Sequence, residues 1–328
     1  FCFYGFLWLI PGYAPVKDIP YYDNVGFSVI AHRGGRGLLP GNTLEAAVNA
    51  IEIGSNVIEI DVHLTADKVL VVRHDAEIDT TSNGKGSIVD MTLESIQSYQ
   101  AGFHEIDYPN AISPAGMRIP TLNTMFQRLP NQRYLIELKP THFDAADALC
   151  DQILAHHLQN QVMVGSFHSS VLTYFRKTCP VVPTSLGKTE LLWFSLLERL
   201  GLGHLYDSPG FAMQIPPSFG GLQVVTPELI RLAHRLNLRV DVWTINDTEK
   251  ANEQNQWYNY TDNKLFVGSN IEGPSLGLDS TTNDSNTVLQ KTLFGIDPDG
   301  DNSITSANLQ LNGNDRFAKR NGDYFSLV

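Results

Sequence analysis

The chain has 328 residues, of which 42% are hydrophobic and 10% aromatic, and this composition excludes wholesale disorder because it can supply a sizeable core. Lys and Arg number 23 against 35 Asp and Glu, which gives a formal net charge of −12 at pH 7. A surface this acidic repels polyphosphates, so we expect no nucleic-acid partner. No run of about eighteen apolar residues occurs, and we expect no segment of the sequence to span a membrane unaided.

The sequence starts with an almost wholly apolar stretch, FCFYGFLWLI, and Lys17 carries its first charge. This stretch predicts the distal end of a signal-peptide core or a membrane anchor, and the alternative is an apolar flap packed on the domain. The following PGYAPVKDIPYYDN indicates an exposed linker. We therefore expect residues 1–23 to be an apolar N-terminal segment and linker that tethers the protein to a membrane if it is an anchor.

From Ser28 onward, short β-branched runs alternate with longer helical stretches. Strands are predicted at residues 28–34, 56–63, 69–75, 133–140, 161–168, 181–187, 221–225 and 239–247. Helices are predicted at residues 43–54, 93–102, 121–129, 143–158, 168–178, 190–203 and 227–238. Strands that alternate with helices require a parallel sheet that is buried on both faces.

Two closures of such a sheet are available, an open doubly wound sheet and a closed TIM (β/α)8 barrel. The first predicted strand is not followed by the GxGxxG fingerprint of a dinucleotide site, and polar residues end nearly every predicted strand. Both observations favour the α/β barrel. We place it at residues 24–275, with LFVGS near its end as a final strand, and we place a short C-terminal extension rich in Asn and Asp at residues 276–328.

Acidic residues on two predicted strands indicate a metal site. Glu59 and Asp61 share one strand, and Glu137 and Lys139 share another, so that each pair projects to one side because positions i and i+2 of a strand face the same way. Three carboxylates in one lumen repel each other unless a cation lies between them, and hard oxygen ligands select Mg²⁺ or Ca²⁺. The alternative is a set of ion pairs with the basic residues Arg33, Arg73 and Lys139.

Two histidines complete a set of residues suited to phosphodiester chemistry. His32 follows the first predicted strand and His74 ends the third. A bound divalent cation polarises a phosphoryl oxygen, and Arg33 and Lys139 hold the others. One histidine then takes a proton from the nucleophile while the second gives one to the leaving alkoxide.

The motifs HRGGRGLLPGNTLEA, EIDVHLTADKVLVVRHD, IPTL, ELKP, SFH and VWTIND occur in this order between residues 28 and 247. In combination they resemble the glycerophosphodiester phosphodiesterase family. The resemblance implies a TIM barrel that hydrolyses glycerophosphodiesters to sn-glycerol 3-phosphate and an alcohol, with a first attack by the substrate's own glycerol hydroxyl. It also implies roles for single residues: His32 and His74 as the acid/base pair, Glu59, Asp61 and Glu137 as metal ligands, Arg33 and Lys139 as phosphate contacts.

Trp243 matches an aromatic residue at the substrate end of the family's pocket, and a Trp in a barrel layer is the alternative. Two departures from the family pattern are visible. Gly41 stands where the family has Glu, and NKLFVGSNIEGP stands where the family closes with a strand similar to GVDGIITDRPD. We expect the first departure to be tolerated and the second to affect stability or substrate fit.

The C-terminal segment contains oxygen-bearing residues spaced as in a calcium-binding loop. One copy occurs, and its last position lacks the bidentate Glu of an EF-hand. A plain turn rich in Asp, Gly and Asn is therefore the equal alternative. The candidate second calcium loop consists of Asp297, Asp299, Asp301, Ser303, Thr305 and Asn308.

Three cysteines, Cys2, Cys150 and Cys179, are too few for a disulfide scaffold or a thiolate zinc site. We expect buried free thiols, with an isolated Cys150–Cys179 pair as the alternative. The apolar start, the acidic tail and the calcium-loop pattern favour a periplasmic or secreted enzyme, and a cytoplasmic one is the alternative.

Two other functions compete with hydrolysis of small glycerophosphodiesters. A lysophospholipase D-like phosphodiesterase is one, because LLWFSLLERLGLGHLY at residues 191–206 is apolar enough to face lipid, or is simply a barrel helix with its hydrophobic stripe. A non-catalytic binding barrel is the other, and phosphate-ester release with and without EDTA distinguishes it from an enzyme. The sequence does not reveal the oligomeric state.

Overall fold

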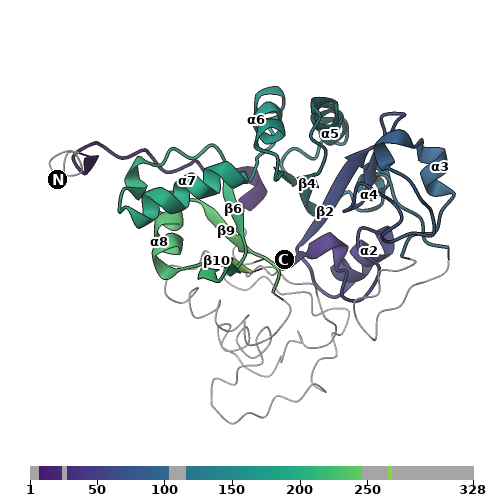
Figure 1. Cartoon of the computed structure of the whole chain (residues 1–328), viewed down its shortest axis with the longest axis horizontal. Coiled ribbons are helices and arrows are strands. Elements are labelled where there is room, and N and C mark those ends of the chain that lie inside the picture. Colours follow the sequence, from purple (N-terminus) through teal and green to yellow (C-terminus); the bar gives the residue numbers. More distant parts are fainter. Residues whose placement is uncertain (1–6, 24–27, 103–115, 246–264, 268–328) are drawn as a thin grey trace, which may run out of the picture.

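Parallel strands in chain order form the centre of the molecule. The computed structural model describes residues 7–23, 28–102, 116–245 and 265–267 (Figure 1). Its parallel segments are β1 (Ile30–Ala31), β2 (Val57–Leu64), β4 (Arg133–Leu138), β5 (Val162–Gly165), residues 184–185, β6 (Ala212–Ile215), β9 (Arg239–Val242) and β10 (Leu265–Val267). Each pairs in parallel with the next. These eight consecutive parallel segments confirm the predicted α/β fold of TIM-barrel type, although no pairing between β10 and β1 is present in the described part of the chain.

The predicted helices are confirmed within a few residues of their expected ends. They are α2 (Leu44–Glu52), α3 (Leu93–Gln97), α4 (Leu122–Arg128), α5 (Phe143–Ala155), α6 (Ser169–Thr178), α7 (Lys188–Arg199) and α8 (Pro227–Arg235). Short 3₁₀ turns lie at η1 (Pro20–Tyr22), η2 (His32–Gly34), η3 (Ile88–Asp90) and η4 (Gly203–Leu205). Threonine side chains cap α2, α3, α4 and α8 by accepting a backbone N–H from the first turn, which satisfies donors that a helix start leaves open.

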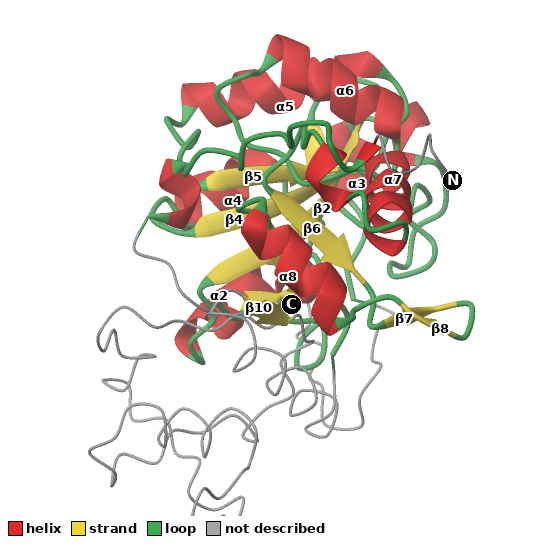
Figure 2. Cartoon of the chain, turned by 90° about the vertical axis from the view of Figure 1, so that its left-hand side faces the viewer, coloured by secondary structure: helices red, strands yellow, loops and turns green. Residues whose placement is uncertain are grey.

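Two predicted barrel strands are wrong. Residues 69–75 yield β3 (Leu70–Val72), which pairs antiparallel with β2 and folds back over it as a hairpin. Residues 221–225 contribute β8 (Leu222–Gln223) to a second hairpin, with β7 (Ser218–Phe219), that projects from the barrel (Figure 2). The barrel strand of this region is β6. The sequence analysis missed it because the strand has only four residues and because Gln214 interrupts their apolar run.

The predicted linker is only partly exposed. Residues 11–15 lie at the surface, but the η1 turn carries Tyr21 into the amino end of the barrel, where it is buried. There it joins a cluster formed by residues near the starts of several strands, among them Ile30, Val57, Leu135 and Met163. The Arg133 guanidinium lies 5.7 Å from the centre of the Tyr21 ring and donates to the Tyr21 carbonyl. The segment before β1 thus closes the barrel opposite the site described below.

Residues 1–6 and the segment at 276–328, with the candidate calcium loop, lie outside the described residues. Among the described residues, no helix combines the length and the apolar character that crossing a bilayer requires.

The cysteine prediction is corrected. Cys150 of α5 and Cys179, which directly follows α6, form a disulfide with Cα atoms 5.8 Å apart, so these two are not free thiols. The two helices lie side by side in Figures 1 and 2, and their packing brings together cysteines 29 positions apart. Spacing along the sequence does not reveal this proximity.

We predict that the disulfide stabilises the fold measurably. A cross-link that closes a loop of 29 residues removes unfolded-state entropy worth about 3.6 kcal/mol. Urea unfolding of the wild type and of the Cys150→Ser/Cys179→Ser double variant, each with and without reductant, measures the difference. The free energy of unfolding of the oxidised wild type should exceed that of the double variant by about this amount, and reductant should remove this difference. A gap that is absent under oxidising conditions would contradict the assignment.

Candidate active site

Strand register brings the three predicted metal ligands together. In the β2–β4 pairing, Asp61 lies opposite Glu137, and Glu59 lies two residues earlier on β2 on the same side. Carboxylate oxygens of all three residues lie within 4.8 Å of one another. Glu59 and Asp61 are buried, and Glu137 is partly buried. The i, i+2 argument therefore placed these side chains correctly.

A sharp turn after β1 supports Glu59. Arg33 lies in the η2 turn with left-handed backbone angles (φ 51°, ψ 38°), which reverse the chain at the end of the strand. Its backbone N–H donates to Glu59 Oε2 at 2.7 Å. Its side-chain Nε lies 3.9 Å from Asp61 Oδ2, so the same residue contacts two of the three carboxylates.

Asn42 fixes Asp61 from the other side, and the sequence analysis did not identify it as a site residue. Its side-chain amide donates to Asp61 Oδ2 at 2.8 Å, and its Oδ1 accepts the Asp61 backbone N–H at 3.1 Å. The left-handed backbone at Asn42 (φ 57°), which Asn tolerates better than most residues, aims the amide at β2. Thr43 is the actual cap of α2.

Lys139 lies between two of the carboxylates. Its Nζ is 3.0 Å from Asp61 Oδ1 and 3.1 Å from Glu137 Oε1. Burial would raise the pKa of Asp61, but the Lys139 ammonium, His74 and the Asn42 amide outweigh it and hold this pKa below its usual value. Part of the alternative interpretation, ion pairs between the carboxylates and nearby basic residues, is therefore present at Lys139 and Arg33.

These bases offset only part of the charge that three ionised carboxylates would carry. Burial and the Asp61 carboxylate raise the pKa of Glu59 well above its usual value and that of Glu137 to about 7. A cation held at about 2.0–2.6 Å from each ligand can span oxygens that lie up to 4.8 Å apart. An all-oxygen donor set with excess negative charge fits Mg²⁺ or Ca²⁺ rather than zinc. These three residues therefore form a centre compatible with a divalent metal.

Both predicted catalytic histidines line the same cavity as the carboxylates. His74 follows the antiparallel β3, not a barrel strand, and its Nδ1 lies 2.8 Å from Asp75 Oδ1. The His74 carbonyl lies 3.1 Å from Nε2 of His63. Burial lowers the pKa of His74, which favours the neutral imidazole. Asp75 therefore orients the His74 ring through Nδ1.

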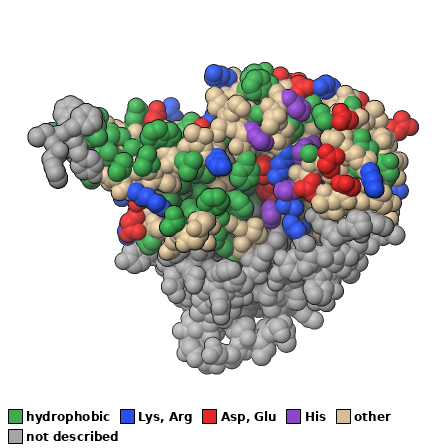
Figure 3. Space-filling model, viewed as in Figure 1, with side chains coloured by type: hydrophobic (Ala, Val, Ile, Leu, Met, Phe, Trp, Pro, Cys, Tyr) green, Lys and Arg blue, Asp and Glu red, His purple; other side chains and the backbone are tan. Residues whose placement is uncertain are grey.

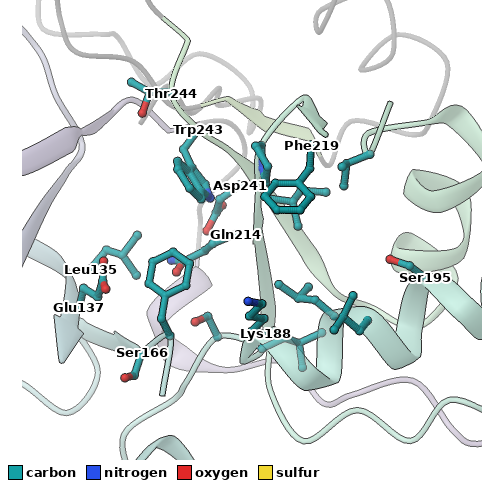
Figure 4. Close-up of a pocket in the computed structure, with 18 of the residues that line it drawn as sticks. Leu135, Glu137, Ser166, Lys188, Ser195, Gln214, Phe219, Asp241, Trp243 and Thr244 are labelled. Carbon is teal, nitrogen blue, oxygen red and sulfur yellow. The ribbon is translucent and has the colours of Figure 1, made fainter. Parts of the chain in front are cut away.

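The cavity extends well beyond this centre and has a volume of about 1160 Å³. Figure 4 shows Glu137 at one end and Ser195 of α7 at the other, with Trp243 beside the path between them. Trp243 is half-buried, and its ring lies 6.2 Å from that of Phe167 in an edge-to-face arrangement. Trp243 therefore lies at the cavity wall and also packs against the apolar cluster that contains Tyr21.

Gly41 is tightly enclosed. A Cβ atom at this position would lie 2.9 Å from Cβ of Arg36 and 3.1 Å from Cβ of Arg33, which is closer than side chains normally approach. A Glu at position 41 would therefore displace the turn that carries Arg33.

A parallel barrel with carboxylate, basic and histidine side chains gathered at one cavity fits a hydrolase centre of the phosphodiesterase class. A profile of the glycerophosphoryl diester phosphodiesterase family matches residues 32–262. A glycerophosphodiester phosphodiesterase of Caldanaerobacter subterraneus subsp. tengcongensis is 31% identical over 226 residues, which cover 67% of this chain and 86% of that protein. Glycerophosphodiester phosphodiesterase 1 of Bos taurus is 34% identical over 243 residues, which cover 67% of this chain and 72% of that protein.

Solved structures share the fold. A phosphodiesterase of Oleispira antarctica in complex with the product sn-glycerol-3-phosphate has a TM-score of 0.60 at 23% identity and covers 77% of this chain and 96% of its own. A glycerophosphodiester phosphodiesterase of Agrobacterium tumefaciens has a TM-score of 0.58 at 22% identity, and the match covers 74% of this chain and 96% of that chain. The chain belongs to the glycerophosphoryl diester phosphodiesterase family. It is therefore an enzyme, a phosphoric diester hydrolase, as the motifs predicted.

We predict that Asn42→Ala weakens divalent-metal binding about 10- to 100-fold, because groups that orient a ligand contribute this much to affinity. Asp61 loses two hydrogen bonds in the variant while the three carboxylates remain. Isothermal titration with Ca²⁺ and Mg²⁺ measures the effect, and Glu45→Gln, an exposed charge change on α2, serves as the control. Equal affinities for Asn42→Ala and wild type would remove Asn42 from the site.

A further buried carboxylate in the cavity, that of Asp241, escaped the sequence analysis. Asp241 of β9 lies inward beside Gln214 of β6 (Figure 4), and their strands pair in register at these two residues. Burial raises the pKa of Asp241 to about 7 although the guanidinium groups of Arg239 and Arg133 lie near it. The alternation of RVDV places Asp241 inward, but Asp in so short a run gave no signal of its own.

We predict that Asp241 makes the fold less stable as pH rises. The unfolded carboxyl titrates near pH 4 and the folded one at about 7, so the folded state binds more protons between these values. The contribution of this group to the free energy of unfolding therefore falls as pH rises from about 4 to 7. At pH 8 the free energy of unfolding of Asp241→Asn should exceed that of the wild type by at least about 1 kcal/mol. Urea unfolding at pH 5 and pH 8 measures this, with exposed Asp90→Asn as the control. A pH-independent difference would contradict the assignment.

Proposed function

We propose that the enzyme hydrolyses glycerophosphodiesters to sn-glycerol 3-phosphate and an alcohol with a divalent cation, Ca²⁺ or Mg²⁺, and a pair of histidines. The observation that carries this proposal is the convergence of His32, His74 and the three carboxylates on one cavity. A product complex of the related fold from Oleispira antarctica contains sn-glycerol-3-phosphate, which supports the substrate class.

Each group has a role that follows from its position. Glu59, Asp61 and Glu137 would hold the cation, which when bound supplies positive charge against the phosphoryl oxygens. Arg33 and Lys139, both at the cavity wall, stabilise negative charge on the same phosphate group.

The histidines move the protons. Asp75 holds His74 through Nδ1, so Nε2 exchanges a proton with substrate, and His32 serves as the second partner of the acid/base pair. One ring accepts the proton of the attacking hydroxyl while the other donates to the departing alcohol oxygen. If the substrate's own glycerol hydroxyl attacks first, the same pair, with roles exchanged, activates water to open the cyclic phosphate.

We propose a location outside the cytoplasm. The Cys150–Cys179 disulfide supports it, because such cross-links persist in oxidising compartments and are rare in the cytosol. The acidic tail with the candidate calcium loop supports it as well, because a weak loop fills at extracellular calcium levels. Fractionation of cells that express the full-length gene is the test. Enzyme found wholly in the soluble cytoplasm would contradict the proposal.

We predict that His32→Ala and His74→Ala each lower turnover of glycerophosphocholine at least about 100-fold while the fold is retained, because acid/base catalysis contributes this much or more. His142→Ala, at the residue directly before α5 and outside the cavity, is the control. EDTA should abolish wild-type turnover, and Ca²⁺ or Mg²⁺ should restore it. A wild type that releases no glycerol 3-phosphate under any of these conditions would favour the non-catalytic binding barrel.

A further inference from the structure

Large hydrophobic side chains line the cavity and remain exposed. Leu192 and Leu196 of α7 are 63% and 46% exposed, and Phe219 and Leu222 of the β7–β8 hairpin are 74% and 62% exposed. We refer to these four residues as the apolar wall. Figure 3 shows hydrophobic side chains gathered on the half of the molecule formed by α7 and α8, beside basic and histidine groups near the centre.

The helix α7 has more apolar surface than its packing requires. Phe194 is fully buried and packs edge-to-face on Tyr206 with ring centres 5.1 Å apart, which accounts for the face toward the core. Leu192 and Leu196, four residues apart, form a second apolar stripe that faces the cavity. A surface helix normally carries polar residues on the face away from the core, so this stripe indicates an apolar ligand.

The apolar wall is continuous with the catalytic centre. The carboxylates, His32 and His74 line the same cavity as the wall, and Figure 4 shows Phe219 across from α7 with Glu137 at the far end. The volume of the cavity, about 1160 Å³, exceeds the range of about 300–1,000 Å³ typical of pockets that enclose a drug-sized ligand. A bare glycerophosphodiester is smaller and fully polar, and it would leave the wall in contact with water.

We propose that the apolar wall binds the single hydrocarbon chain of a phosphodiester substrate, so that the enzyme acts on lysophospholipids. This inference rests on the proposed function, because the reaction is the same hydrolysis. The oxygen of water bonds to phosphorus, the bond from phosphorus to the head-group oxygen breaks, and one proton passes to the departing alcohol. The phosphate group binds at the carboxylate end, and the chain extends from it toward Ser195.

The test compares substrates that share a head group and differ in the chain. Choline release is measured from glycerophosphocholine and from lysophosphatidylcholines with six- and ten-carbon chains, each below its micelle concentration. Each methylene buried against apolar side chains is worth up to roughly fourfold in affinity. The wild type should therefore show at least a tenfold higher kcat/KM for the ten-carbon substrate than for glycerophosphocholine.

Variants of the wall separate chain binding from catalysis. Leu192→Asp/Leu196→Asp on the helix and Phe219→Ser on the hairpin should each remove most of the gain from the chain and leave glycerophosphocholine turnover within about twofold of wild type. Because the two sets lie on different elements, a folding defect in one does not prevent the test. Leu154→Asp, an exposed leucine of α5 away from the cavity, is the control and should change neither activity.

The outcomes distinguish this inference from the proposed function. Hydrolysis of glycerophosphocholine with no gain from the chain would overturn the inference and leave the proposed function standing. Hydrolysis of neither substrate would overturn both. Two other outcomes would also overturn the inference, each with wall variants that keep the gain for monomeric substrate. Loss of binding to phosphatidylcholine vesicles would assign the wall to a membrane. Loss of a dimer seen by size-exclusion chromatography would assign it to a second copy of the chain.

Discussion

The repulsion among three carboxylates held in one buried space is the constraint on which the rest of the site depends. Parallel pairing in register between β2 and β4 forces Asp61 against Glu137, and the period of the strand adds Glu59 on the same side. Lys139, Arg33 and the Asn42 amide offset part of this charge. Burial, and after it the Asp61 carboxylate, raise the pKa values of Glu59 and Glu137, and the cluster of three carboxylates is compatible with a divalent cation.

The scaffold isolates this charged centre from the rest of the molecule. Tyr21 and residues near the strand starts fill the amino end of the barrel, with the Arg133 guanidinium against the Tyr21 ring, and the three carboxylates lie toward the opposite end. The β2–β3 hairpin folds His74 over that end, and Asp75 holds its ring. On the far side of the cavity, α7 and the β7–β8 hairpin add exposed leucine and phenylalanine side chains to the lining. One cavity thus joins a site for a phosphate group to an apolar surface.

Most of the site could be predicted from the sequence, because its residues carry charges that packing in a barrel does not explain. The pairs Glu59/Asp61 and Glu137/Lys139 follow from the two-residue period of a strand, and the motifs point to His32 and His74. Other features depend on proximity in three dimensions. The amide of Asn42 reaches Asp61 through a left-handed turn, and the Cys150–Cys179 pair depends on how α5 packs on α6. The fold class was predictable from alternation, but β6 was missed because Gln214 breaks its short apolar run.

The most direct test of the account is the position of a bound cation. Crystals soaked in Mn²⁺, which shares the oxygen ligands of Mg²⁺ and Ca²⁺, should show one anomalous peak with an oxygen of each of Glu59, Asp61 and Glu137 at about 2.0–2.6 Å. Lys139 should then lie beside the peak and contact the remaining carboxylate oxygens. A map with no peak at this place, and with Lys139 alone bridging Asp61 and Glu137, would contradict the account.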